Sequence, residues 1–432
     1  MNRFYYSVLL TLILPLVPLK LLWRGIKQPA YRQHWGERFG FYKITATKPV
    51  IWLHCVSVGE TRAAEPLINA LQATHPNHQI LLTHGTPTGR EAGEALFGNR
   101  IDRVYLPYDV PFAVNKFLNH FKPTIALIME TELWFNLIAA CKQREIPMLL
   151  LNARLSEKSA SGYAKLGKLA QEGLQSLSAV AAQTADDASR LQNLGATNIS
   201  VAGNLKFDVE PPQSLIDKGL QLKQLFGERP VFLAASTRDG EEALILDALA
   251  KINIPNLVTI LVPRHPQRFD AVAKLLEQRG INYQRKTLFN NDATGLEHSS
   301  TGLAANSHVG SRPIIILGDS MGEMSMYYAA CDIAFIGGSL LSYGGQNLIE
   351  AARLGKPILI GEYTFNFVEA SNDAVTAGAA MRVKNADDLM QKVEALLKNK
   401  AVLVNMQQTA LSFSSASAGA TARLMALIKQ YL

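Results

Sequence analysis

Short apolar runs alternate with amphipathic stretches from residue 49 onward, and this alternation constrains the fold more than any other feature of the chain. Consecutive strands separated by helices pair as a parallel sheet, because each strand must return to the same edge through a crossover. The sequence therefore predicts an α/β protein. The strands expected in the first half are VIWLHC (50–55), QILLT (79–83), TIALIM (124–129), PMLLL (147–151) and SAVAAQ (178–183), with helices expected, for example, over 62–74 and 111–121.

The alternation breaks at FDVEPPQ (207–213), a polar segment with two consecutive prolines. A second series of strand-like runs follows it: VFLAAS (231–236), TILVP (259–263), PIIIL (313–317), DIAFIGG (332–338) and PILIG (357–361). We therefore expect two doubly wound domains, over 29–208 and 231–432, with a linker over 209–230. Ligands of such sheets bind beyond the carboxyl ends of the strands, so a gap between the two domains is the expected site. A Ser-, Gly- and Asn-rich stretch over 284–312 is expected to form a surface loop.

Residues 1–28 are expected to form a membrane anchor. The run FYYSVLLTLILPLVPLKLL (4–22) carries one charge, Lys20, and as a helix it would be about 28 Å long, close to the thickness of the hydrocarbon core. Pro15 and Pro18 predict a kink, so the segment could cross the bilayer or lie in its interface. A buried core helix and a cleaved signal peptide are the alternatives, and the signal peptide fits poorly because the basic residues follow the apolar run.

Most of the net charge of +7 lies beside this anchor. Residues 20–48 contain seven basic residues and one acid, which places this segment on the cytoplasmic side and favours contact with an anionic lipid surface. No aromatic-rich basic patch predicts a nucleic-acid partner. The three cysteines are isolated, and the chain lacks HExxH, D-x-D and GxxxxGK[ST] motifs, so neither a metal nor ATP hydrolysis is expected.

Three polar motifs in the first domain are candidates for catalysis. HCVSVGE (54–60) brings Glu60 to the end of the first strand, where it is either a helix cap with Ser57 or a general base. IMETELW (128–134) places Glu130 and Glu132 at the end of an apolar strand, one of them as a cap or as a second carboxylate beside Glu60. GNLKFD (203–208) contains Lys206, either solvated or facing an anionic substrate.

Three motifs in the second domain are candidates for nucleotide binding. VPRHPQRF (262–269) places Arg264 at the end of a strand, where a guanidinium suits a phosphate or a base carbonyl. GDSMGEM (318–324) offers close backbone approach at Gly322. GGSLLSYGGQNLIE (337–350) has paired glycines whose N–H groups could face a phosphate, before a helix expected to begin near Gln346 and Asn347. Asn347 and Glu350 have the spacing of a capping box, and Glu350 also suits ribose hydroxyls.

These motifs resemble, in order and over essentially the whole chain, the 3-deoxy-D-manno-octulosonic acid (Kdo) transferases of Gram-negative bacteria. PAYRQHWGERFGFY (29–42), LPYDVP (106–111) and NARLSEKSASGY (152–163) add to the resemblance. It implies the two-domain GT-B fold and an inverting transfer of Kdo from CMP-Kdo to a lipid A precursor, at the cytoplasmic face of the inner membrane. No cofactor other than the donor substrate is implied.

The resemblance also implies roles for individual residues. Glu60 is the general base, and Glu130 and Lys206 support the transition state. The donor-binding residues are Pro263, Arg264, Met321, Gly322, Glu323, Gly338, Ser339, Gly345, Asn347, Leu348, Ile349 and Glu350. One departure lies in ASTRDGEE (235–242), where family members usually carry His-Glu in place of Arg238 and Asp239.

Two other functions stay open on the sequence. A different GT-B transferase using a UDP-sugar would have the same fold and differ only in its base and sugar pockets. A membrane-bound nucleotide-binding scaffold without catalysis would not need Glu60.

Overall fold

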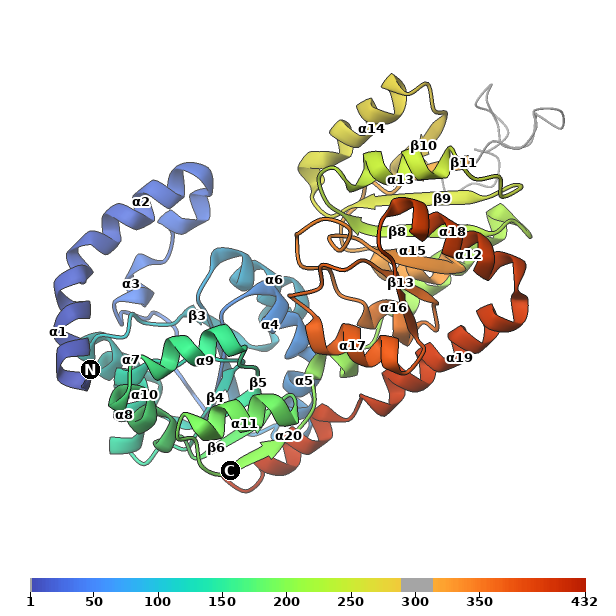
Figure 1. Ribbon diagram of the computed structural model, residues 1–432. Helices are drawn as coiled ribbons and strands as arrows, with labels where there is room; N and C mark the ends of the chain where they lie inside the picture. The colour runs from blue at the N-terminus through green and yellow to red at the C-terminus, as the bar shows by residue number, and fades with distance from the viewer. Residues whose placement is uncertain (1, 289–313) are drawn as a thin grey trace. The chain divides into compact units, whose positions relative to one another are not determined.

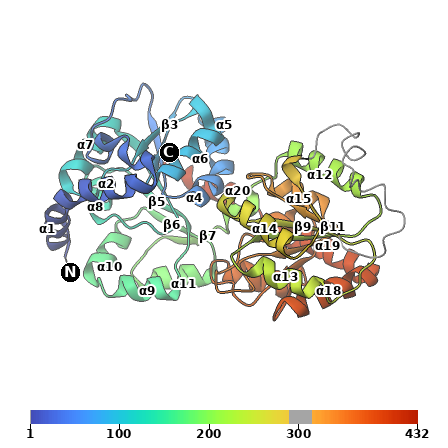
Figure 2. The ribbon, with the colours of Figure 1, turned by 90° about the horizontal axis from the view of Figure 1, so that it is seen from above.

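The computed structural model describes residues 2–288 and 314–432 and divides the chain into two compact units. Unit 1 comprises Met1–Val209 with Ser417–Leu432, and unit 2 comprises Glu210–Ala416. Each unit contains a seven-stranded parallel sheet with helices on both faces (Figures 1 and 2). The predicted fold class, α/β of the GT-B type with two Rossmann-like units and an N-terminal apolar helix, is confirmed.

The sheet of unit 1 has the strand order β3-β2-β1-β4-β5-β6-β7. The chain builds outward from β1 in one direction and then returns to the other side of β1 to place β4. This reversal is the topological switch point of the sheet, where ligands of such folds bind. The strands are β1 Val50–Cys55, β2 Gln79–His84, β3 Asp102–Tyr105, β4 Pro123–Met129, β5 Met148–Ala153, β6 Ala179–Ala182 and β7 Ile199–Val201.

Both faces of this sheet are buried, as the continuous apolar runs predict. Alternate side chains of β1 enter different cores: Trp52 packs in the cluster that contains Phe117, and Leu53 in the cluster that contains Leu67. The covering helices are α3 Trp35–Arg38, α4 Val58–Ala63, α5 Glu65–Thr74, α6 Pro87–Phe97, α7 Pro111–Phe121, α8 Phe135–Gln143, α9 Glu157–Ala164, α10 Lys168–Gln175, α11 Ala185–Asn193 and α20 Ala420–Ile428.

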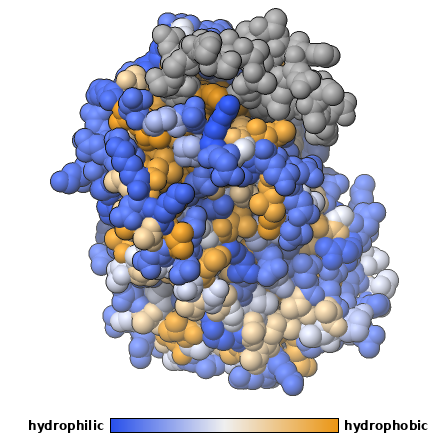
Figure 3. Space-filling model, turned by 90° about the vertical axis from the view of Figure 1, so that its right-hand side faces the viewer, coloured by the Kyte–Doolittle hydropathy of each residue, from blue (hydrophilic) through white to orange (hydrophobic). Residues whose placement is uncertain are grey.

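Unit 2 repeats this architecture with the strand order β10-β11-β9-β8-β12-β13-β14. Its switch point lies between β8 and β12. Figure 3 shows one face of the molecule, on which hydrophilic residues surround smaller hydrophobic groups. The strands are β8 Val231–Thr237, β9 Val258–Pro263, β10 Tyr283–Arg285, β11 Ile314–Leu317, β12 Ile333–Ile336, β13 Ile358–Ile360 and β14 Ala380–Arg382, and the helices are α12 Gln213–Phe226, α13 Glu241–Leu249, α14 Phe269–Gln278, α15 Met324–Ala330, α16 Ile349–Arg353, α17 Val368–Thr376, α18 Ala386–Lys398 and α19 Lys400–Ala416.

Two predicted boundaries differ from the structure. The expected linker over 209–230 contains α12, which packs against α15 so closely that a Cβ on Gly219 would lie 2.3 Å from the carbonyl oxygen of Met326. The end of the chain, expected in the second domain, belongs to unit 1, because Leu424 and Ile428 are fully buried in the core that contains Ile51. Most of the loop predicted over 284–312 lies outside the described residues, and its first residues form the end of β10 and a 3-10 turn, Lys286–Leu288.

The N-terminal segment forms α1 Arg3–Ile13, a 3-10 turn Leu14–Leu16 and α2 Val17–Lys27, which meet at a bend near the two prolines (Figure 1). By length and composition, Arg3–Lys27 could cross a membrane. The segment exposes many large apolar side chains, so it fits a membrane anchor. They are Phe4, Tyr5, Val8, Leu9, Leu12, Ile13, Leu16, Leu19, Leu22, Trp23 and Ile26.

The opposite face of α1 contacts the folded part of unit 1. The Tyr6 hydroxyl donates to Asp109 Oδ2 at 2.8 Å, and the Ser7 hydroxyl donates to Asn136 Oδ1 at 2.7 Å. The Tyr6 ring packs edge-on against Phe135, with 5.3 Å between the ring centroids. α1 is therefore attached by specific contacts to α8 and to Asp109, which precedes α7.

Candidate active site

The switch point of unit 1 brings two acidic motifs to one place. Glu60 lies in α4, directly after β1, and Glu130 and Glu132 follow β4, the neighbour of β1 in the sheet. Parallel neighbours end at the same edge, so residues about 70 positions apart in the chain become adjacent. The strand order thus assembles the carboxylates that the sequence analysis singled out.

Glu60 acts as a helix cap and belongs to the acidic cluster at the same time. Ser57 is the N-cap of α4, and its hydroxyl oxygen accepts from the Glu60 backbone N–H at 3.4 Å. The Glu60 carboxylate accepts from the backbone N–H of Val56 at 2.8 Å and from the Ser57 hydroxyl at 2.7 Å. The side chain is 7% exposed. The predicted capping box is therefore formed, and it holds the carboxylate in one orientation.

Glu130 and Lys206 are brought together, as the resemblance implies. Their Oε1 and Nζ atoms are 3.8 Å apart. Glu130 has a backbone φ of 56°, which is uncommon for a residue with a side chain and is found where the surroundings enforce it. The backbone N–H of Leu205 donates to Asn152 Oδ1 at 3.0 Å, so the end of β5 fixes the segment that carries Lys206.

Burial and mutual repulsion make this cluster electrostatically unusual. Burial raises the pKa of Glu60, the negative charge of Glu130 raises it further, and the hydrogen bonds from Ser57 and Val56 oppose the shift. Burial, followed by the charges of Glu60 and Glu130, raises the pKa of Glu132 to about 7. The sequence left open whether Glu130 or Glu132 is the second carboxylate beside Glu60, and the pairing of β1 with β4 couples Glu132 to both of the other acids.

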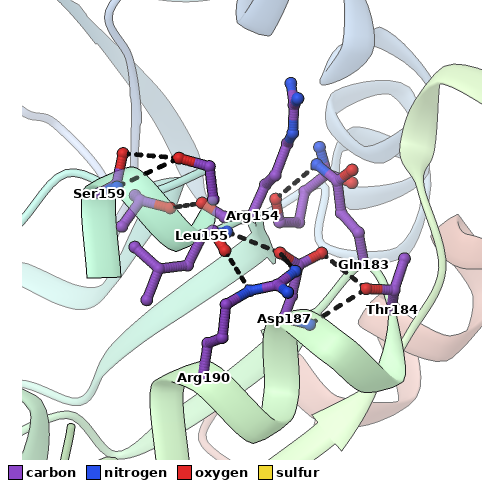
Figure 4. Close-up of polar contacts among 10 residues, drawn as sticks. Arg154, Leu155, Ser159, Gln183, Thr184, Asp187 and Arg190 are labelled. Carbon is purple, nitrogen blue, oxygen red and sulfur yellow. Dashed lines mark hydrogen bonds and ion pairs between the residues drawn. The ribbon is translucent and has the colours of Figure 1, made fainter. Parts of the chain in front are cut away.

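The loop after β5 adjoins this cluster and is held by a polar network (Figure 4). The Thr131 hydroxyl, between Glu130 and Glu132, donates to the carbonyl oxygen of Arg154. The next residue, Leu155, donates its N–H to Asp187 Oδ1 at 2.7 Å. The NARLSEKSASGY motif (152–163), which contributes to the family resemblance, therefore supplies the third loop at this edge of the sheet.

In unit 2 the donor-binding candidates also gather at the carboxyl edge of the sheet. Because β11, β9, β8 and β12 are neighbours, the loops that follow them are adjacent. Arg264 follows Pro263, the buried last residue of β9, and its exposed side chain donates from Nε to Gln346 Oε1 at 3.2 Å. That contact joins the loop after β9 to the glycine-rich loop after β12.

Two N–H groups of the glycine-rich loop donate to acceptors within the protein, contrary to the prediction that they face a phosphate. The N–H of Gly338 donates to Glu241 Oε2 at 2.6 Å, and the N–H of Gly345 donates to the carbonyl oxygen of Gly338 at 2.7 Å. Both glycines have positive φ, 71° and 75°, so they are needed for the shape of the loop. Ser339 is fully buried, and its hydroxyl accepts from the N–H of Gly361 at 2.8 Å.

Sequence reasoning missed Glu241, the residue that organises this loop. Its buried carboxylate also accepts from the N–H of Arg238 at 2.8 Å and of Leu340 at 3.0 Å. Burial raises its pKa, and these backbone hydrogen bonds oppose the shift. The only local signal was an acid at the start of the helix after β8, in DGEE (239–242), which is a common helix-start pattern.

The helix predicted to begin near Gln346 and Asn347 begins at Ile349, as α16. The Asn347 side chain accepts from the N–H of Ile349 at 3.0 Å and donates to Glu350 Oε1 at 3.1 Å, so the two polar residues of the predicted capping box do interact. Leu348 and Ile349 are buried, and they anchor this segment in the unit 2 core.

The turn after β11 places Met321 and Gly322 at the surface, with Met321 52% exposed. Glu323 receives a hydrogen bond from Lys286 Nζ at 2.6 Å. Burial alone would raise the pKa of Glu323, but the hydrogen bonds from Lys286 and Ser320 outweigh it, and the pKa is lowered. Glu323 is therefore an ionised acceptor at this edge.

The departure at Arg238 also lies at this edge. Its guanidinium Nη1 lies 2.9 Å from His265 Nε2 and its Cζ lies 4.7 Å from the centroid of the Tyr343 ring. Arg238 thus contacts the loops after β9 and β12. Over residues 2–288 and 314–432, no group of three or more His, Cys, Asp and Glu side chains is arranged to hold a metal ion.

Comparisons with known proteins identify the family of this chain. A family model described as 3-deoxy-D-manno-octulosonic-acid transferase (kdotransferase) matches residues 33–209. A 3-deoxy-D-manno-octulosonic acid transferase of Bordetella pertussis is 38% identical over 447 residues, covering 100% of both chains. One of Haemophilus influenzae is 38% identical over 442 residues, covering 100% of this chain and 99% of that protein.

Among solved structures, a glycosyltransferase from Rickettsia africae has a TM-score of 0.57 and 14% identity, covering 89% of this chain and 98% of that one. At this identity the likeness concerns the fold alone. The full-length identity to the Bordetella and Haemophilus proteins shows the family. This chain belongs to the 3-deoxy-D-manno-octulosonic acid (Kdo) transferases.

Proposed function

We propose that this Kdo transferase of lipopolysaccharide biosynthesis moves Kdo from CMP-Kdo to a lipid A precursor, with inversion, and that Glu60 is the general base. The observation that carries the proposal is the buried Glu60 carboxylate at the β1–β4 switch point, with a pKa raised by burial and by Glu130. A carboxylate with a raised pKa is a stronger base, and proton transfer is most efficient when the pKa of the base is near the working pH.

In the proposed reaction, Glu60 accepts a proton from a sugar hydroxyl of the acceptor. The acceptor oxygen then bonds to the anomeric carbon of Kdo while the bond from that carbon to the CMP phosphate oxygen breaks, and CMP leaves with the bonding electrons. Positive charge develops on the sugar ring, and the carboxylate of Glu130 is suited to stabilise it. Lys206 supports this role, since its ammonium lies 3.8 Å from Oε1 of Glu130 and can hold that carboxylate in place.

The leaving phosphate needs a cation or N–H donors, and Arg264 is the better candidate. The N–H groups of Gly338 and Gly345 point to acceptors within the protein, whereas the Arg264 guanidinium is exposed at the end of β9 and carries several N–H donors, one of which is directed at Gln346. A guanidinium can bind a phosphate through two parallel hydrogen bonds. We assign the rest of CMP to the Met321–Glu323 turn and the Asn347–Glu350 segment, where Glu323 and Glu350 suit the hydroxyls and amino group of a cytidine.

A lipid acceptor requires the enzyme to work at a membrane surface, and the N-terminal segment supports this. Its exposed apolar side chains and the basic residues over 20–48 suit an anionic leaflet, at the cytoplasmic face of the inner membrane. The contacts of α1 favour an interfacial position over a span. A segment that crossed the bilayer would carry Tyr6 about 20 Å from Lys20, toward the far side, and Tyr6 could not reach Asp109.

The central test is incubation with CMP-Kdo and lipid A precursor, followed by mass measurement of the product. The wild type should add Kdo, and Glu60→Gln should lower the transfer rate by about 10²–10⁴-fold, because an amide cannot accept the proton. Glutamine keeps one acceptor, for the N–H of Val56, and its NH2 can donate to the Ser57 hydroxyl oxygen, so folding and CMP binding should persist. Transfer at a near-normal rate by Glu60→Gln would disprove the base assignment and point to another base, whereas no transfer by the wild type would favour a non-catalytic scaffold.

Donor choice is tested by titrating CMP and UDP calorimetrically against the full-length protein. CMP should bind more tightly, and Arg264→Ala should weaken CMP binding by roughly 10-fold or more, because it removes a charge-assisted hydrogen bond worth about 1.5–3 kcal/mol. Arg279→Ala, on the same unit but paired with Asp247, is the matched control. Preferential UDP binding would favour a UDP-sugar transferase instead.

The raised pKa of Glu132 predicts a pH dependence of stability. The pKa of Glu132 is about 7 in the folded protein, against an ordinary value of 4.5. Protonation of Glu132 therefore contributes its full amount to the free energy of unfolding below pH 4.5, and this contribution is lost as the pH rises toward 7. Relative to wild type, Glu132→Gln should gain on the order of 2 kcal/mol in the free energy of unfolding between pH 5 and 7.5. Denaturant titrations at several pH values measure this, with the exposed Glu157→Gln as control. Parallel profiles for wild type and Glu132→Gln would show that Glu132 ionises normally.

The position of the anchor is tested by thiol labelling in sealed bacterial membranes. The native cysteines are buried, so single cysteines at Asn2 and Lys158 can be probed with a membrane-impermeant maleimide. We expect both positions to react from the cytoplasmic side only. Reaction of position 2 from the opposite side would establish a transmembrane segment, and loss of the protein from the membrane fraction would contradict membrane attachment altogether.

A further inference from the structure

Arg154 is a basic residue at the acidic edge of unit 1, and it has no part in the proposed transfer step. It follows β5, the neighbour of β4 in the sheet, and its carbonyl oxygen accepts from the hydroxyl of Thr131, the residue between Glu130 and Glu132. The backbone of Arg154 is therefore in direct contact with the loop that carries the two acids.

The backbone on both sides of Arg154 is fixed by buried polar contacts. Asp187, which is 1% exposed, accepts from the N–H of Leu155 at 2.7 Å and from the Thr184 hydroxyl at 2.8 Å. Arg190 donates from Nε to the carbonyl oxygen of Leu155. On the other side, the Gln183 amide donates to the carbonyl oxygen of Asn152 at 2.9 Å. This network positions residue 154 without using its side chain.

The guanidinium of Arg154 extends away from this network, and no hydrogen bond or ion pair reaches it in Figure 4. Among residues 2–288 and 314–432 it has no partner, although other cations of unit 1 have one: Arg90 is bound to Glu37, Arg190 to Asp187 and Lys206 to Glu130. The side chain of Arg154 is half-buried, and its backbone is held in place by this network.

We propose that Arg154 binds a phosphate group of the acceptor and thereby positions the acceptor hydroxyl at Glu60. This inference rests on the proposed function, in which unit 1 carries the base that must meet the acceptor. A guanidinium presents two parallel N–H donors, a geometry that matches a phosphate and that a lysine does not reproduce. A second oxyanion could satisfy the same chemistry, namely the carboxylate of the Kdo being transferred, and the experiment separates the two sources.

The test uses the full-length enzyme, the acceptor with and without its phosphates, and variants Arg154→Ala and Arg154→Lys. With the phosphorylated acceptor, Arg154→Ala should raise the acceptor KM at least 10-fold while the CMP-Kdo KM stays within about 2-fold. Arg154→Lys should recover only part of the loss. With the dephosphorylated acceptor, wild type and Arg154→Ala should have the same acceptor KM. Lys158→Ala, which removes an exposed charge four residues away, should leave both constants unchanged.

Two results would overturn the proposal. An increase in the CMP-Kdo KM that does not depend on acceptor phosphate would assign Arg154 to the Kdo carboxylate. Unchanged KM values for both substrates would show that Arg154 binds neither of them.

Binding of the phosphorylated acceptor is also measured without CMP-Kdo, by titration of detergent-solubilised acceptor into wild type and Arg154→Ala. Weaker binding by Arg154→Ala, together with no transfer by wild type, would reject the proposed function and keep the anion site. Equal thermal unfolding midpoints of the two proteins check that the substitution is local.

Discussion

The clustering of carboxylates at the β1–β4 switch point is the constraint on which the proposed chemistry of this protein depends. Burial opposes the ionisation of Glu60 and Glu132, and the charges of neighbouring carboxylates oppose it further, because like charges repel. The hydrogen bonds from Val56 and Ser57 offset part of this cost at Glu60. The pKa values of Glu60 and Glu132 remain raised, which is the property that the proposed general base and its neighbour require.

Unit 2 uses buried contacts to shape the loop to which we assign the nucleotide. The carboxylate of Glu241 accepts from backbone N–H groups of both the β8 and the β12 loops, so one buried acid joins the two loops at the switch point. The glycines provide the positive φ angles that this loop requires, and we assign the cation for the leaving phosphate to Arg264 at the end of β9. Arg238 contacts His265 and Tyr343 at the same edge.

The N-terminal segment and Arg154 are the two features that we relate to the proposed acceptor. The same buried Asp109 that accepts from the N-terminal N–H groups of α8 also accepts from Tyr6, so attachment of α1 is built into the fold of unit 1. If the N-terminal segment binds a membrane, as we propose, these contacts hold unit 1 in a defined orientation to the leaflet. Arg154 is the residue that we propose to meet a phosphate of the acceptor. Under these two proposals, both features restrict how the acceptor can approach Glu60.

The central strands, the anchor and the acidic and glycine-rich motifs could be predicted from the sequence, because each depends on local hydrophobicity or on turn chemistry. All the predicted strands are present, and those missed, β3, β7, β10 and β14, are the four sheet edges, which are short and only partly buried. Local patterns could not predict that α20 packs on unit 1, that Glu241 binds the N–H groups of a loop almost 100 residues away, or that Glu132 is coupled to Glu60. Those contacts are decided by strand order and burial, because the residues involved are brought together only when distant segments pair.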